Sequence, residues 1–253
     1  MSFCDLHWFS NVLGKAVNTW VLLPDTDVKG PYPVFYLLHG LSDDNTIWMR
    51  RTRIECYVAG LPLIVVMPDG GRGFYTDHAQ GPHWGEHIAK ELPDFIEKTF
   101  HARTDGNGRA IGGLSMGGYG ALRLTMGNPG RYCSVNCHSG CLTYGHVKYE
   151  FSTPGREAEY RAMVGEKDTG GPFDLFTATE ECLKTGLVPK VKIDHGTEDW
   201  LLPQAREYSA FLKKLGIEHE YNEYPGNHNW DFWDTHIREA IEFHAKNLGI
   251  AKS

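Results

Sequence analysis

Ser115 lies between two glycines, Gly113 and Gly117, in a G-x-S-x-G pattern. A short apolar run over 109–112 precedes the pattern, and a helix-forming run over 120–126 follows it. A sharp strand-to-helix turn of this kind strains the serine backbone and exposes the hydroxyl, and side chains at the two glycine positions would collide with the neighbouring strand and helix. The pattern therefore predicts a nucleophilic serine. A glycine-rich turn that cradles a phosphate is the alternative, although neither full phosphate-binding pattern is present.

A serine nucleophile needs a base, an acid that orients the base, and donors for the oxyanion. Asp199 lies in a loop that follows a predicted strand over 188–194, and His228 lies in the loop after the next predicted strand, 218–224. The chain order serine, acid, histidine is one of those known for serine hydrolases. We therefore predict a catalytic triad of Ser115, Asp199 and His228.

Neighbouring residues offer alternatives for two of these roles. Glu198 shares a loop with Asp199 and is the competing acid. Asp231 opens the final predicted helix beside His228, where we expect it to act on the helix dipole. Chain order, or a position within a strand or helix, argues against the other candidate bases, which are His195, His219, His236 and His244.

The oxyanion of such an enzyme is held by two backbone N–H groups, one after the nucleophile and one in the loop after the third strand. Here these would be the amides of Met116 and Leu41, the second of which directly follows His39-Gly40. The alternative for His39-Gly40 is a plain turn at the end of a strand. The residue type at position 41 is incidental, because the backbone carries the role.

A rival motif is present at His83-Trp84-Gly85-Glu86-His87, which matches H-x-x-E-H. On a helix this pattern places two histidines one turn apart, so that they could bind zinc while the glutamate acts as a base. Gly85 inside the helix and the lack of an evident third ligand argue against it. We predict no metal site.

The elements that must position these residues alternate along the chain. Strands are predicted over 3–9, 17–23, 34–38, 61–67, 109–112, 132–137, 188–194 and 218–224. Helices are predicted over 46–59, 85–100 (with a kink or break at Pro93), 120–126, 201–215 and 230–248. This alternation predicts an α/β fold with a mostly parallel central sheet and helices on both faces.

Residues 142–187 break the alternation and are rich in glycine, proline, tyrosine and charge. We expect them to form a small insertion after the sixth strand, with short helices near 157–164 and 173–183, within a single domain that spans 1–253. The length of 253 residues suits one such domain.

Composition limits the classes of partner. The formal net charge is −7, and there is no run of lysine and arginine, which argues against nucleic acid or an anionic membrane as the main partner. No apolar stretch approaches the roughly 20 residues that span a bilayer. Residues 1–8 have neither the basic start nor the apolar core of a signal peptide. These observations predict a cytoplasmic protein.

The six cysteines are expected to be thiols, because no secretion signal is visible. Cys133, Cys137 and Cys141 invite a metal interpretation. However, a predicted strand and a turn separate them, so their sulfurs should not meet at one point. We expect buried thiols that pack as small apolar side chains.

Four aromatic residues in loops or at helix ends are candidates for the wall of the substrate cleft, where they could stack on sugar or aryl groups. They are Trp48, Tyr75, Trp84 and Trp200. Ordinary core packing is the alternative for each of them.

Several segments together resemble the esterase D-like branch of the α/β-hydrolases, which includes tributyrin esterases and is grouped with family 1 carbohydrate esterases. The resemblance is carried by residues 36–40, 48–52, 63–68, 73–77, 91–93, 113–120, 198–199 and 228–230. It implies hydrolysis of short acyl esters by a Ser-His-Asp triad without a cofactor. Ser115, Asp199 and His228 match the triad, and Leu41 and Met116 match the oxyanion donors. Relatives of this kind are often homo-oligomers.

We therefore expect a serine carboxylesterase that acts on small-molecule, short-chain acyl esters through an acyl-enzyme. A carbohydrate acetyl esterase or a feruloyl esterase is the alternative. An S-formylglutathione hydrolase-like thioesterase is disfavoured, because those enzymes usually carry a cysteine soon after the oxyanion loop, where this chain reads Leu41-Ser42-Asp43-Asp44. An inactive binding module would be expected to lack a triad residue.

Overall fold

The computed structural model describes residues 1–148, 153–166 and 169–251. Within these ranges the strands form one eight-stranded sheet in the order β1-β2-β4-β3-β5-β6-β7-β8. The strands are β1 (Ser2–Ser10), β2 (Lys15–Leu23), β3 (Val34–Leu38), β4 (Ile64–Pro68), β5 (Arg109–Leu114), β6 (Ser134–His138), β7 (Lys190–Gly196) and β8 (His219–Tyr224). Only the pairs β1–β2 and β2–β4 are antiparallel among these described strands, so the predicted mostly parallel sheet is confirmed.

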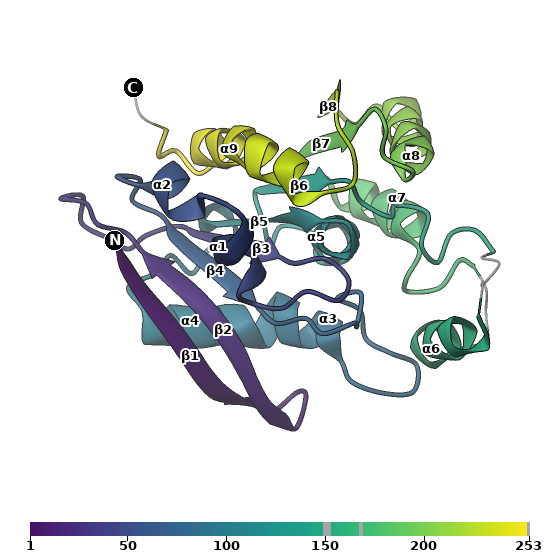
Figure 1. Cartoon of the computed structure of the whole chain (residues 1–253), viewed down its shortest axis with the longest axis horizontal. Coiled ribbons are helices and arrows are strands. Elements are labelled where there is room, and N and C mark those ends of the chain that lie inside the picture. Colours follow the sequence, from purple (N-terminus) through teal and green to yellow (C-terminus); the bar gives the residue numbers. More distant parts are fainter. Residues whose placement is uncertain (149–152, 167–168, 252–253) are drawn as a thin grey trace.

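Helices cover both faces of the sheet, as predicted (Figure 1). They are α1 (Ile47–Arg51), α2 (Ile54–Val58), α3 (Trp84–Glu86), α4 (Leu92–Thr99), α5 (Met116–Gly127), α6 (Pro154–Val164), α7 (Leu175–Thr185), α8 (Leu202–Lys214) and α9 (Trp230–Asn247). One apolar cluster joins the sheet to α4, α5, α7 and α8, and a second joins it to α1, α2 and α9. β3 and β4 are buried along their whole length because they lie between these two layers.

The helix predicted over 46–59 is two short helices, so that prediction was wrong in its middle. Thr52 leaves the helical conformation with φ −133° and ψ 171°, and its hydroxyl donates to the Trp48 carbonyl. The Arg53 amide then donates to Asp234 of α9 at 2.9 Å. A threonine side chain that bonds a nearby carbonyl competes with helix continuation, and here the packed α9 supplies the second partner.

Pro93 has a different effect from the kink or break expected of it. It lies at the start of α4, and a π-helical turn, His87–Glu91, joins α3 to α4 directly before it. Proline has no N–H to donate to a preceding carbonyl. The chain accommodates this loss by widening one turn, which sequence periodicity does not reveal.

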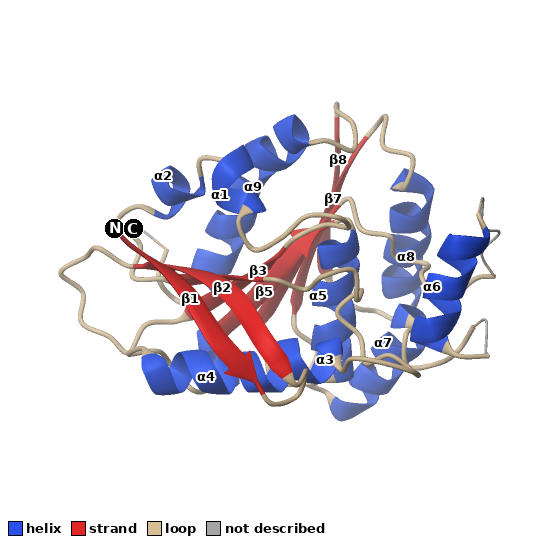
Figure 2. Ribbon diagram, turned by 60° about the horizontal axis from the view of Figure 1, so that its bottom comes forward, coloured by secondary structure: helices blue, strands red, loops and turns tan. Residues whose placement is uncertain are grey.

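The predicted insertion lies between β6 and β7 and carries α6 and α7. Figure 2 shows α6 at the margin of the molecule, away from the sheet. Residues 149–152 and 167–168 of the predicted 142–187 segment lie outside the described residues. The single-domain assignment of 1–253 stays a prediction. In the described ranges, no helix combines the length and the apolar character that crossing a membrane requires.

Candidate active site

Ser115 occupies the turn between β5 and α5. Its backbone has φ 52° and ψ −117°, a conformation that non-glycine residues seldom adopt. The turn is held in part by its amide, which donates to the His138 carbonyl at 2.8 Å. Strain of this kind persists only where surrounding contacts enforce it, so the turn is a built feature of the fold.

The two flanking glycines are required by the space around them. A Cβ on Gly113 would lie 2.6 Å from the Leu38 carbonyl oxygen, and a Cβ on Gly117 would lie 2.6 Å from the His39 carbonyl oxygen. Both atoms belong to the end of the neighbouring strand and cannot move aside easily. The steric argument made from the G-x-S-x-G pattern therefore describes the geometry of this turn.

The structure brings Ser115, His228 and Asp199 together from three separate loops. His228 Nε2 lies 3.1 Å from Ser115 Oγ, and His228 Nδ1 lies 2.9 Å from Asp199 Oδ2. A carboxylate only accepts hydrogen bonds, so Nδ1 carries the ring proton and Nε2 presents a lone pair to the serine hydroxyl. This arrangement can remove a proton from Ser115 and stabilise the resulting imidazolium.

Asp199 is kept as a carboxylate by its surroundings. Burial alone would raise its pKa, but hydrogen bonds from His228 and from the Leu201 amide outweigh burial, and its pKa lies below the ordinary value. The Leu201 amide donates to Oδ1 at 2.9 Å, which leaves Oδ2 for the histidine. The acid is therefore both charged and fixed in orientation.

The competing acids have other partners. Glu198 turns away from His228, because its Oε2 accepts from the Gly226 amide at 2.8 Å and its Oε1 accepts from the Thr197 hydroxyl. Asp231 lies in the first turn of α9, where a negative charge complements the helix dipole. Neither carboxylate shares the position that Asp199 occupies.

The two residues whose amides are predicted to hold the oxyanion border the same cavity as the serine. Leu41 and Met116 both line it, together with Ser115 and His228. Met116 is the first residue of α5, so its N–H has no acceptor within the helix and is available to a ligand. The role of these amides stays a prediction.

The cavity at Ser115 has a volume of about 450 Å³. Its apolar wall comes mainly from the predicted insertion and from the loop after β4. These lining residues are Phe74, Cys141, Tyr144, Tyr160 and Met163. Phe74 and Tyr144 stack with ring centroids 4.0 Å apart, and the Tyr160 ring packs edge-on against Tyr144. This side of the cavity is therefore apolar.

An ion pair crosses the rim of this cavity. Arg72, in the loop after β4, binds Glu159 of α6 through two nitrogens at 2.6 and 2.8 Å, and its third nitrogen donates to the Ser42 hydroxyl. The guanidinium lowers the pKa of Glu159. The pair links α6 to the residue that follows Leu41. Sequence reasoning missed these residues at the rim and wall of the cavity. The unusual Gly, Pro and Tyr content of the insertion was the feature of the sequence that could have pointed to them.

Only one of the four aromatic residues predicted for the cleft lines it in the described structure. Trp200 is 71% exposed and borders the cavity, with its ring 5.5 Å from that of His228. The prediction was wrong for Trp48, Tyr75 and Trp84, which are buried. Trp48 Nε1 donates to the Leu38 carbonyl, the Tyr75 hydroxyl donates to the His39 carbonyl, and Trp84 packs over Gly71 and Gly73. Each of the three supports the strand ends or loops beneath the site.

The H-x-x-E-H segment does not form a regular helix. His83 only caps the three-residue α3, and His87 begins the π-helical turn. His87 Nδ1 faces Glu91 at 2.7 Å and Ser10 at 3.1 Å, so its nearest carboxylate is outside the motif. Within the described residues, no group of three or more His, Cys, Asp or Glu side chains could hold a metal ion.

The six cysteines, all among the described residues, are free. Burial raises the pKa of both the Cys137 and the Cys141 thiols, which keeps them protonated. Cys141 also borders the cavity at Ser115. These thiols serve as small packing groups.

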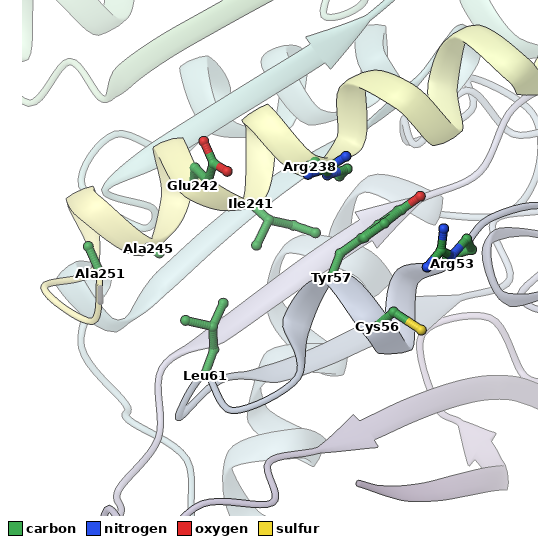
Figure 3. Close-up of a pocket in the computed structure, with 9 residues that line it drawn as sticks. All are labelled: Arg53, Cys56, Tyr57, Leu61, Arg238, Ile241, Glu242, Ala245 and Ala251. Carbon is green, nitrogen blue, oxygen red and sulfur yellow. The ribbon is translucent and has the colours of Figure 1, made fainter. Parts of the chain in front are cut away.

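A larger cavity, of about 680 Å³, lies elsewhere on the molecule (Figure 3). It is bordered by α2 and α9, and the Arg238 guanidinium lies 5.6 Å from the centre of the Tyr57 ring. None of the residues that line it belongs to the triad or to the cavity at Ser115. Size alone therefore does not identify the reactive site, which depends on the convergence of nucleophile, base and acid.

Comparison with known proteins gives consistent results. Residues 10–244 match the family model named Esterase. An acetyl esterase of Caldicellulosiruptor saccharolyticus is 28% identical over 97% of this chain and 99% of its own. The substrate-bound serine hydrolase FphF of Staphylococcus aureus superposes with a TM-score of 0.87 at 24% identity, covering 96% of this chain and 98% of its own. The S-formylglutathione hydrolase of Agrobacterium tumefaciens superposes with a TM-score of 0.81 at 21% identity, covering 98% of this chain and 95% of its own. The two structural likenesses establish the fold.

Proposed function

Because this chain belongs to the Esterase family of α/β-hydrolases, we propose that it hydrolyses short-chain acyl esters with Ser115, His228 and Asp199 as its catalytic triad. The protein is a serine carboxylesterase. The observation that supports the residue assignment is the unbroken contact chain from Ser115 Oγ to His228 and on to Asp199, at 3.1 and 2.9 Å.

The reaction begins when Ser115 Oγ attacks the ester carbonyl carbon. His228 Nε2 takes the serine proton and returns it to the leaving alkoxide, which departs as the alcohol. Asp199 holds the imidazole in the required tautomer and stabilises its positive charge. Water then attacks the acyl-enzyme with the same base, releasing the carboxylic acid and free Ser115.

Negative charge develops on the carbonyl oxygen in both steps. The amides of Leu41 and Met116 are our proposed donors to that oxygen. Donors fixed in advance at such a position can supply several kcal/mol of transition-state stabilisation, because they need no reorganisation during the reaction. The strained Ser115 backbone places Oγ at the mouth of the cavity that both amides border.

The acyl group would occupy the apolar side of the cavity, against Tyr144, Tyr160 and Met163. We propose a preference for acyl chains of about two to four carbons, because α6 and α7, the described helices of the segment between β6 and β7, are each 11 residues long and too short to form a large apolar lid. Each further methylene would contribute roughly 0.8 kcal/mol only where an apolar surface buries it. The acetyl esterase named above is consistent with the short end of this range.

A carbohydrate ester is the second candidate substrate, and one observation favours it. Trp200 is largely exposed beside His228, where its indole face could stack on a sugar ring in the leaving group. Trp200→Ala should then raise KM for an acetylated sugar at least several-fold and leave KM for p-nitrophenyl acetate nearly unchanged. Equal effects on both substrates would remove the support for a sugar.

Active-site labelling tests the assignment of the nucleophile. A fluorophosphonate probe should add its mass to the tryptic peptide that contains Ser115. Ser115→Ala should abolish both labelling and hydrolysis of p-nitrophenyl acetate, while Ser209→Ala, on α8 and outside the lining of the cavity, should retain labelling. Full hydrolysis by Ser115→Ala would refute the proposal.

We propose that the protein uses no cofactor. Its proposed partner is a small-molecule ester. The predicted cytoplasmic location and the expectation that nucleic acid is not a partner stay predictions.

A further inference from the structure

β1 is an edge strand with a free outer side. It pairs with β2 over its full nine residues, and no other strand in the described part of the chain pairs with it. Figures 1 and 2 both show it at the margin of the sheet. A long edge of this kind presents unpaired N–H and C=O groups, which form a template for another strand.

The sequence of β1 is symmetric in its chemistry about Leu6. Reading outward from that centre, the residues form matched sets of one acid with one histidine, two apolar residues, two phenylalanines and two serines. These are Asp5 with His7, Cys4 with Trp8, Phe3 with Phe9, and Ser2 with Ser10. Such symmetry matters only to a strand that pairs with a copy of itself in the antiparallel sense.

The two faces of β1 differ in exposure. Cys4, Leu6 and Trp8 are partly buried and pack against the core. The opposite face carries two exposed phenylalanines, Phe3 at 43% and Phe9 at 61%. Phe3 packs edge-on against Trp20 of β2, with ring centroids 4.8 Å apart, whereas Phe9 is the more exposed of the two. A phenylalanine that is 61% exposed at an open sheet edge is unusual, because native edges are usually blunted by charge or proline.

We propose that two copies of this chain associate through β1, paired antiparallel about a two-fold axis at Leu6. In this register Phe3 of each copy faces Phe9 of the other. Asp5, whose Oδ1 lies 3.5 Å from His7 Nε2 of its own chain, also faces His7 of the other copy. Aromatic pairs and opposite-charge pairs directly across a strand pair each stabilise it. The contact is the same on both copies, as a two-fold axis requires, and it joins the two sheets into one.

The opposite edge of the sheet lacks these features. β8 reads His-Glu-Tyr-Asn-Glu-Tyr, and two of its glutamates, Glu220 and Glu223, are already paired with Lys192 and Arg206. A strand of this composition has no symmetric arrangement of opposite charges about its centre. The match to the Esterase family model begins at residue 10, so all of β1 except Ser10 lies outside the region that the match covers.

Sedimentation velocity of the full chain over a concentration series tests the proposal. The wild-type chain should form dimers. Phe3→Lys/Phe9→Lys places lysines opposite each other and should raise the dimer Kd at least tenfold. Phe3→Lys/Phe9→Glu is equally polar but places opposite charges face to face, so it should recover much of the lost affinity. A wild-type chain that stays monomeric, or equal dissociation of the two variants, would overturn the proposal.

Disulfide trapping tests the register. In a Cys4→Ser/Cys56→Ser background, Phe3→Cys chains mixed with Phe9→Cys chains should give a covalent dimer on mild oxidation, whereas either variant alone should give little. Cross-linking of each variant with itself to the same extent would contradict a register centred on Leu6. All of these variants should retain hydrolysis of p-nitrophenyl acetate, because no residue of β1 borders the cavity at Ser115.

Discussion

His39 Nδ1 lies 2.8 Å from the carbonyl oxygen of Gly40. The Gly70 amide donates to His39 Nε2 at 2.8 Å, so the ring proton resides on Nδ1 and is donated to that carbonyl. A trans peptide is planar, and its C=O and N–H point in opposite directions. By holding the Gly40 carbonyl, His39 therefore fixes the direction of the Leu41 N–H, the proposed oxyanion donor.

Substitutions at His39 should separate these two hydrogen bonds. Asparagine places its amide nitrogen near the position of Nδ1 and can keep the bond to Gly40, whereas glutamine reaches the position of Nε2 and can keep only the bond from Gly70. Removal of an oxyanion donor costs about 10² to 10³ in kcat. We expect His39→Gln to lose roughly tenfold or more in kcat, with KM little changed, and His39→Asn to lose less. Equal kcat values for two equally stable variants would contradict this role.

The acid of the triad can be assigned by comparing three carboxylates. Asp199→Asn keeps the shape of the side chain but cannot stabilise the imidazolium, and the equivalent change in a serine protease costs about 10⁴ in kcat. We expect a loss of at least roughly 10² here. Glu198→Gln and Asp231→Asn should lose far less, since neither carboxylate contacts His228 in the structure. The measurement is kcat/KM under one set of conditions, with circular dichroism as the control for folding.

Stability should fall on mild acidification because of a buried histidine in α9. His244 Nδ1 accepts from the Ser134 hydroxyl, and its Nε2 donates to the Asn136 side-chain oxygen. Burial lowers its pKa to about 3. The unfolded chain binds a proton at this position below about pH 6.5 and the folded chain does not. The free energy of unfolding should therefore fall by about 1.4 kcal/mol per pH unit well below that value.

Urea unfolding between about pH 7 and 5 measures this slope, above the range where most carboxylates titrate. His244→Gln removes the titrating group while keeping a donor and an acceptor, so its slope should be smaller by about one proton. Burial also lowers the pKa of His87 and His195, so the variant should retain part of the dependence. A variant with the wild-type slope would show that His244 is not the source.

The acyl preference should depend on α6. Met163→Ala removes a large side chain from the wall of the cavity and should admit longer chains. We expect the ratio of kcat/KM for p-nitrophenyl octanoate to that for the acetate to rise at least roughly fourfold, the value of one extra buried methylene. Glu157→Ala, on the same helix but not bordering the cavity, is the matched control. A ratio that changes equally in both variants would assign the effect to helix stability.

The chemistry of the triad could be predicted from the sequence because it depends on local patterns at strand ends. Ser115 lies in a turn that glycine spacing reveals, and Asp199 and His228 each lie in the loop that follows a predicted strand. Parallel strands bring such loops to one edge of the sheet whatever the detailed packing.

The walls of the cavity could not be predicted in the same way. The direction of an aromatic side chain in a loop depends on contacts that lie far away in the sequence. Trp48 and Tyr75 both bond to carbonyls at the end of β3 and its following loop, which places them beneath the site instead of in it. Tyr160 and Met163 lie on a helix that contacts residues far away in the sequence, through the ion pair to Arg72 and through backbone hydrogen bonds from Ala79 and Gln80. No periodicity encodes those contacts.

The reacting groups and the acyl-facing groups are carried by different stretches of the chain. The proposed catalytic residues follow the ends of β5, β7 and β8, whereas much of the apolar wall is contributed by the segment between β6 and β7. Substitutions confined to α6 can therefore change which acyl groups fit without altering the residues that break the ester bond. A mutagenesis library restricted to residues 154–164 could therefore be screened for new acyl substrates, because every variant in it keeps the proposed catalytic residues.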